Sequence, residues 1–259
     1  PDDVIQSTYQ LGLANSISSI FIALVSPFLG AIADRGSAKK KLLITFAFLG
    51  VLMTASLWFV EQGEWQLAVF FYVIATIGFM AGNIFYDSLL PAVASREKVD
   101  YVSALGYSLG YLGGGSLFAV NVLMYLHPDW FGIPDSSTAI RISFLTVAIW
   151  WAVFTLPIII FLPEPKSSNS VPLSKAVFSG ISQLRETYDH IREMKIIGTF
   201  LLAFWLYEDG VATIVRMAGK IASSLGFAAG DIITAILMVQ FIGFPAALLY
   251  NWFAKKIGI

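Results

Sequence analysis

The stretch that decides the fold of this chain is Ser26-Pro-Phe-Leu-Gly-Ala-Ile-Ala-Asp-Arg-Gly-Ser-Ala-Lys-Lys-Lys41. A long apolar run ends in it, two charged residues and three lysines follow, and a second apolar run begins at once. A run of that length crosses a bilayer as a helix, because a helix satisfies its own backbone hydrogen bonds in lipid. A short lysine-rich turn between two crossings marks the cytoplasmic side. The stretch therefore predicts two membrane-spanning helices joined by a cytoplasmic loop.

The composition extends this interpretation to the whole chain. The 259 residues are 57% hydrophobic and 13% charged, whereas soluble domains hold about 25% charged residues. A net charge of −1 argues against a nucleic-acid-binding protein, which needs a basic face. There is no cysteine for a disulfide or a thiolate metal site, and the two histidines lie far apart in loop-like stretches. We predict a multi-pass membrane protein that has the lipid bilayer as a partner and binds no metal, cofactor or nucleic acid.

Seven apolar segments have the length of about 17–25 residues that a spanning helix needs. They are residues 11–33, 42–60, 67–90, 102–126, 142–162, 196–215 and 232–253. Of the 16 lysines and arginines, all except Arg141, Arg216 and Lys220 fall on one side of these spans, and the positive-inside rule assigns that side to the cytoplasm. The predicted fold class is an all-α membrane protein with about seven transmembrane helices, whose first residues lie outside.

The chain starts at Pro1 rather than at Met, and no signal peptide explains an outside start. We therefore expect an earlier helix to precede it and parts to be missing from both ends. The longest connection opens with Pro163-Glu-Pro165, a linker composition. Apolar residues then recur at helical spacing from Leu173 to Ile191. They predict an amphipathic helix that lies either on the inner membrane surface or against the cytoplasmic ends of the spans.

Glycines recur at every fourth position in the fourth segment, at Gly106, Gly110 and Gly114. Such a stripe lets another helix backbone approach closely. We expect helix packing here, and in a transporter the same stripe would let helices slide. Single amides at Gln10, Asn15, Asn121 and Gln240 are expected to link helices in the same way.

The third segment ends with a polar group of Asn83, Tyr86 and Asp87. Asn83 and Asp87 are four residues apart and share one helix face. An asparagine at this depth is costly in lipid and usually faces a protein interior or a wet cavity. Asn83 and Tyr86 are therefore candidates for a substrate path. Asp87 is expected near the inner interface, where it could pair with Arg35 or cap the basic loop.

The sixth segment carries Tyr207, Glu208 and Asp209 in its middle, followed by Gly210. Acidic residues at membrane depth are a functional hypothesis by default. They could form a substrate or cation site or carry a proton, or they could pair with Arg216 or Lys220 near the outer surface. Both interpretations stay open. The sequence contains no phosphate-binding loop and no hydrolase pattern, so we predict that the chain is not an enzyme.

Several stretches together resemble the vacuole-effluxer-like branch of the major facilitator superfamily. They are Gly30-Ala-Ile-Ala-Asp-Arg-Gly-Ser37, Phe85-Tyr-Asp-Ser-Leu-Leu-Pro91, Ser103-Ala-Leu-Gly-Tyr-Ser-Leu-Gly-Tyr-Leu-Gly-Gly-Gly115 and Leu206-Tyr-Glu-Asp-Gly-Val-Ala-Thr213. The resemblance implies helices two to eight of a twelve-helix fold. Residues 1–162 would then be an N-terminal half-bundle without its first helix, 163–195 a cytoplasmic linker, and 196–259 the first two helices of the second half.

The resemblance also implies a secondary transporter of the bacterial plasma membrane that works by rocker-switch alternating access. It would move a small solute, such as an amino acid or related metabolite in efflux, with a proton or cation as coupling ion. Gly30, Asp34, Arg35 and Asp87 would form its cytoplasmic gate. The superfamily pattern expects a second Gly and an Arg where this chain has Ser37 and Ala38, so the gate could be paired differently. The alternative function is a non-transporting membrane scaffold or assembly subunit with the same fold.

Overall fold

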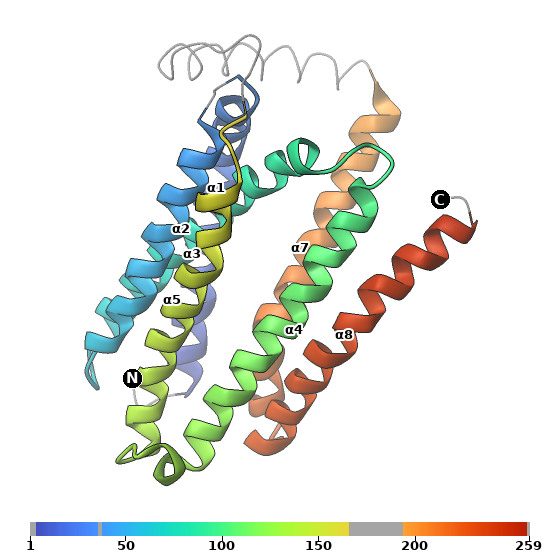
Figure 1. Ribbon diagram of the computed structural model, residues 1–259. Coiled ribbons are helices and arrows are strands. Elements are labelled where there is room, and N and C mark those ends of the chain that lie inside the picture. The colour runs from blue at the N-terminus through green and yellow to red at the C-terminus, as the bar shows by residue number, and fades with distance from the viewer. Residues whose placement is uncertain (1–3, 36–37, 166–193, 258–259) are drawn as a thin grey trace.

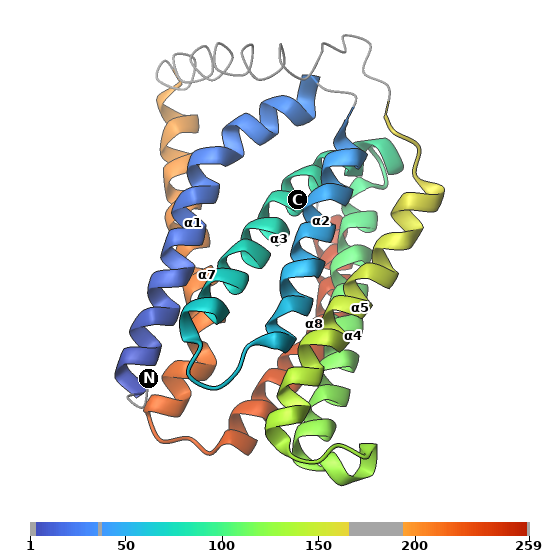
Figure 2. The ribbon, with the colours of Figure 1, turned by 90° about the vertical axis from the view of Figure 1, so that its left-hand side faces the viewer.

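The computed structural model describes residues 4–35, 38–165 and 194–257 and shows a bundle of long helices (Figures 1 and 2). No strand occurs in these ranges, and seven of their helices are long and apolar enough to cross a membrane. The long helices are α1 (Val4–Arg35), α2 (Lys39–Ser56), α3 (Trp65–Val93), α4 (Val99–Leu126), α5 (Ser136–Phe161), α7 (Lys195–Ser224) and α8 (Ala229–Ile257), and the short turns η1 (Leu57–Phe59) and η2 (Pro128–Phe131) follow α2 and α4.

These elements confirm the predicted all-α membrane fold with seven spans. Each helix covers its predicted apolar segment almost completely, and most extend into the polar residues beside it. The largest difference is in α7, which continues to Ser224 rather than ending near residue 215. The predicted amphipathic helix, residues 173–191, lies outside the described residues.

The tightest packing joins α2, α3 and α5. A Cβ atom at Gly78 of α3 would lie 2.8 Å from the carbonyl oxygen of Phe46 and 2.9 Å from the nitrogen of Gly50 in α2. The ring of Trp151 in α5 covers Gly50 from the other side. Phe85 is completely buried and stacks on Phe46, with ring centroids 5.9 Å apart. Small residues thus allow backbone contact, as is usual between membrane helices.

Side-chain hydrogen bonds link the other helices of this bundle. The Tyr72 hydroxyl in α3 donates to Asn15 Oδ1 in α1 at 2.8 Å. The Thr146 hydroxyl in α5 donates to Asn121 Oδ1 in α4, also at 2.8 Å. Both asparagines therefore connect helices, as the sequence predicts for single amides in lipid.

Directed polar contacts hold the bundle at its outer end. Arg141 of α5 donates from Nε (2.9 Å) and Nη2 (2.7 Å) to the carbonyl oxygen of Trp58, and its guanidinium also lies 5.1 Å from the Trp58 ring centroid. The Asp135 carboxylate caps α5 by accepting a hydrogen bond from the backbone N–H of Thr138 at 2.8 Å. Both contacts satisfy backbone groups that helix ends leave unpaired.

A second set of contacts holds the cytoplasmic end and involves the basic loop. Lys40 Nζ donates to the carbonyl oxygen of Ile159 in α5 at 2.7 Å, and Lys39 Nζ donates to that of Ser88 in α3 at 3.3 Å. The Glu164 carboxylate accepts from the backbone N–H groups of Lys40 (2.9 Å) and Lys41 (3.1 Å). Among the described residues, the carboxylate that caps this loop is therefore Glu164, and Asp87 accepts no hydrogen bond from the described part of the loop.

The helices α7 and α8 pack less densely than the rest. Neither helix buries a residue. Figure 1 shows α8 running beside α4. Arg216 Nη1 of α7 donates to the Ser19 hydroxyl of α1 at 3.0 Å. The pair is attached to the bundle chiefly through α8, which packs along α4.

Candidate solute cavity

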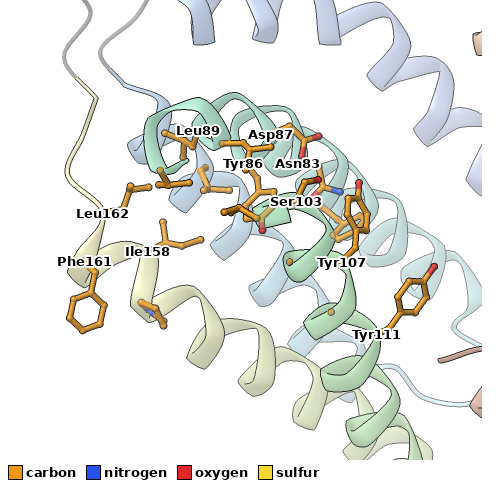
Figure 3. Close-up of a pocket in the computed structure, with 18 of the residues that line it drawn as sticks. Asn83, Tyr86, Asp87, Leu89, Ser103, Tyr107, Tyr111, Ile158, Phe161 and Leu162 are labelled. Carbon is orange, nitrogen blue, oxygen red and sulfur yellow. The ribbon is translucent and has the colours of Figure 1, made fainter. Parts of the chain in front are cut away.

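A cavity of about 750 Å³ opens between α3, α4 and α5 (Figure 3). Small-molecule sites in proteins have volumes of about 300–1,000 Å³. The lining starts in the middle of α3, at Phe79, and reaches Val93 at its cytoplasmic end, which is ~21 Å along the helix. A smaller cavity of about 170 Å³ shares part of this lining and lies against α2 and α5. The space therefore reaches from the bundle's middle to its cytoplasmic end.

The polar group predicted on α3 lines this cavity. Asn83, Tyr86 and Asp87 all contribute to its wall, and all three side chains are exposed to open space. Tyr86 lies beside Gly106 of α4, where an added Cβ would lie 3.5 Å from the Tyr86 hydroxyl oxygen. Asn83 and Tyr86 thus occupy the position expected of path residues, and Asp87 joins them.

Sequence reasoning missed the polar side chains that α4 adds. Ser103, Tyr107 and Tyr111 line the cavity opposite the α3 group. Figure 3 shows Tyr107 reaching from α4 towards Asn83 and Asp87. Ser103, Tyr107 and Tyr111 follow one another at intervals of four residues, so they share one face of α4. This spacing could have predicted them as cavity residues.

The glycine stripe of α4 divides between two surroundings. Gly106 and Gly110 line the cavity, and an added Cβ at Gly110 would meet nothing within 4 Å. Further along, a Cβ at Gly114 would lie 4.0 Å from Gln240 Nε2 of α8. A Cβ at the neighbouring Gly115 would lie only 2.9 Å from Gln240 Cβ. Close helix packing is thus strongest at Gly115, and the first two glycines leave room for the cavity.

The line of contact between α4 and α8 borders the cavity through Gln240. Ser108 of α4 is fully buried, and its hydroxyl donates to the carbonyl oxygen of Phe244 at 2.7 Å. The Tyr111 ring lies against Gly243, where an added Cβ would be 2.8 Å from it. We call this contact, made by Ser108, Tyr111 and Gly115 with Gln240, Gly243 and Phe244, the α4–α8 seam.

The three path candidates on α7 lie outside the cavity lining. Tyr207, Glu208 and Asp209 are all exposed. Arg216, one suggested partner for these acids, donates to Ser19 instead.

The residues proposed for the cytoplasmic gate lie at the ends of two helices. Gly30, Asp34 and Arg35 belong to the last turns of α1, and Asp87 is near the end of α3. The side chains of Asp34 and Arg35 are outside those that the structure describes. A Cβ at Gly30 would meet nothing within 4 Å. The gate remains a prediction.

Comparisons with known proteins all point to one family. A family model described as "Vacuole effluxer Atg22 like" matches residues 5–100 and 95–259. The chain is 34% identical to the "Uncharacterized MFS-type transporter YxiO" of Bacillus subtilis, over 97% of this chain and 58% of the relative. It is 21% identical to Autophagy-related protein 22 of Yarrowia lipolytica, over 77% of this chain and 46% of the relative.

Autophagy-related protein 22 of Saccharomyces cerevisiae strain S288c is 25% identical over 77% of this chain and 44% of the relative. The chain thus spans about half the length of the curated relatives it matches. No solved structure matches it.

Proposed function

This chain belongs to the vacuole effluxer Atg22-like family of the major facilitator superfamily, and from that premise we propose that it is part of a secondary transporter whose solute passes through the cavity between α3, α4 and α5. The seven spans and the Bacillus relative identify it as a multi-pass integral membrane protein of the bacterial plasma membrane. The proposed transport activity belongs to the whole protein of which this chain would be a part.

The observation that carries the proposal is the polar cavity at membrane depth. Asn83 and Asp87 on α3 face Tyr107 on α4 in a space large enough for a small molecule. Ionisable and amide side chains are expensive within a membrane and usually mark a substrate or ion pathway. A scaffold would need no such group. The cavity therefore favours the transporter over the scaffold alternative.

The division between the dense bundle and α7–α8 supports a rocking mechanism. We assign residues 1–162 to an N-terminal half-bundle without its first helix, 163–195 to the cytoplasmic linker and 196–259 to the first two helices of the second half. These would be helices two to eight of a twelve-helix transporter. In such folds, alternating access is largely a rigid-body rocking of two halves about a central site. The α4–α8 seam would then be one contact between the halves.

The remaining details complete the proposal. Gly30, Asp34, Arg35 and Asp87 would close the cytoplasmic side, while Tyr207, Glu208 and Asp209 would approach the path from α7. The family description names an effluxer, so we propose efflux of a small solute, such as an amino acid or related metabolite, with a proton or cation as coupling ion.

The test is transport by proteoliposomes that hold the full-length protein. A labelled panel of amino acids and amines would be followed under an imposed pH or Na⁺ gradient. We expect at least one solute to move, and Asn83→Ala and Glu208→Gln to slow it at least tenfold. Glu61→Gln, a change of an exposed acid in the loop between α2 and α3, should leave the rate unchanged. A rate indifferent to both Asn83→Ala and Glu208→Gln would reject this path. A protein that folds and moves nothing would favour the scaffold.

A further inference from the structure

The charge of the cavity lining has a single sign. Among the described residues that line it, Asp87 is the only charged side chain. A site of one sign raises the local concentration of ligands of the opposite sign and repels its own. An anionic solute is therefore disfavoured in this cavity.

No described cation neutralises Asp87. Lys39 Nζ donates to the backbone oxygen of the next residue along α3, Ser88, at 3.3 Å. Lys255 Nζ of α8 lies 5.7 Å from the ring centroid of Tyr101, which is near the start of α4. The exposed Asp87 carboxylate is therefore available to the ammonium group of a ligand.

Aromatic side chains form much of the remaining polar wall. Tyr86 and Tyr107 line the cavity from opposite helices, and the Tyr107 ring lies towards Asp87 (Figure 3). A cation close to the face of an aromatic ring is attracted by the ring quadrupole, and this attraction favours ammonium groups in particular. Rings and a carboxylate together are thus a typical environment for an organic cation.

Oxygen acceptors are also within the lining. Asn83, Ser103 and Gln240 each offer a side-chain oxygen to an N–H donor. No group of three or more His, Cys, Asp or Glu side chains that could hold a metal ion occurs in the described ranges. The lining suits a ligand that carries its own N–H donors better than it suits a bare metal ion.

We propose that this cavity recognises a cationic amine, with Asp87 as the counter-ion of its ammonium group and Tyr86 and Tyr107 as the aromatic walls around it. The proposal rests on the proposed function of the same cavity and names the class of its solute. A free carboxylate on the ligand is not matched by any described cation in the lining, so a simple amine should bind better than a zwitterion of the same size.

The test uses three probes that share a ring and differ in charge: phenethylammonium, 2-phenylethanol and phenylacetate. Their binding to the detergent-solubilised full-length protein is followed by thermal stabilisation, because a ligand that binds only the folded state raises its melting temperature. We expect phenethylammonium to stabilise the protein in a saturable way. The neutral and anionic probes should not. Equal stabilisation by phenylacetate, or none by phenethylammonium, would overturn the proposal.

Two pairs of variants assign the binding to these residues. Asp87→Asn keeps the shape of the side chain and should weaken phenethylammonium binding at least tenfold. Glu61→Gln is its control. Tyr107→Leu removes the ring and should weaken binding about two- to fivefold, whereas Tyr107→Phe keeps the ring face and should bind like the wild type. If folded Asp87→Asn protein bound phenethylammonium with unchanged affinity, Asp87 would not be the counter-ion.

These experiments can reject the ammonium site and the transporter function independently of each other. Charge-selective binding without transport would support the ammonium site and contradict the transporter. Transport of some other solute, with no binding of phenethylammonium, would support the transporter and contradict the ammonium site. Transport that responds to Asp87→Asn only through its coupling to the pH gradient, with phenethylammonium binding intact, would assign Asp87 to the coupling proton and also overturn the proposal.

Discussion

The helices α1–α5 and the pair α7–α8 are both long and apolar, yet they are held in different ways. Every residue that the described ranges bury lies between Ala14 and Thr155, and none belongs to α7 or α8. In the first region, backbones touch at glycines and polar side chains hold both ends. The second region meets the first mainly along the α4–α8 seam. The difference shows that a long apolar sequence is enough for a helix to span the membrane. Its close packing against other helices depends on small residues and directed contacts.

The largest difference in stability is expected when the same substitution, glycine to alanine, is made once in each region. Gly78→Ala would push a Cβ into backbone atoms of Phe46 and Gly50 that cannot move aside easily. We expect it to lower stability by about 1–3 kcal/mol. The same change at Gly210 of α7 meets nothing within 4 Å and should be neutral or slightly stabilising, because alanine favours helices. Thermal melting of the full-length protein in detergent measures both variants.

Equal melting temperatures for these two variants would break the comparison. They would mean that the contact between α2 and α3 is no tighter than the surroundings of α7.

The second effect is expected at the seam. Gly115→Ala places a Cβ 2.9 Å from Gln240 Cβ and should separate α4 from α8. Gly114→Ala meets only the end of the Gln240 side chain, at 4.0 Å, and serves as the matched control. We expect Gly115→Ala to increase hydrogen exchange in α8 and to leave α2 and α3 protected, since the bundle does not depend on the seam. A loss of protection in α2 and α3 would show that the two regions unfold together.

A smaller effect is expected at the cytoplasmic end. Glu164→Ala removes the acceptor for the backbone N–H groups of Lys40 and Lys41 and should cost about 1 kcal/mol, as the loss of a helix cap does. Glu164→Gln keeps one acceptor oxygen and should cost less. Amide hydrogen exchange at the start of α2 is the measurement. An unchanged exchange rate in Glu164→Ala would contradict this capping role.

The smallest effect is expected at the outer end and depends on pH. Hydrogen bonds from the backbone N–H and the hydroxyl of Thr138 hold the pKa of Asp135 below its usual range. A lowered pKa in the folded state stabilises the fold above the unfolded-state pKa of about 3.9, and this contribution is lost as the pH falls through the folded-state pKa.

Wild-type protein should therefore lose slightly more thermal stability below about pH 4 than Asp135→Asn, whose amide oxygen still caps the helix without titrating. The melting temperatures of the two proteins, measured across this pH range, provide the check. Parallel pH curves would remove Asp135 from the acid response.

The sequence by itself determined the seven spans, their alternating direction and the amides that link helices. These properties depend on local quantities: the length of an apolar run, the distribution of lysine and arginine, and the cost of an amide in lipid. Residues 11–33, for example, predicted α1 without any knowledge of its neighbours. Asn15 and Asn121 could be predicted as links between helices because a polar group in lipid has few alternatives.

Only the tertiary structure decided which face of each helix meets which neighbour. A helix that is apolar on nearly all sides carries little information about its own rotation, so Gly106 and Gly115 look alike in sequence. The fold places the first at a cavity and the second against α8. In the same way, Tyr107 became a cavity residue, and Glu164 became the cap of α2, because side chains that lie far apart along the chain were brought together by packing.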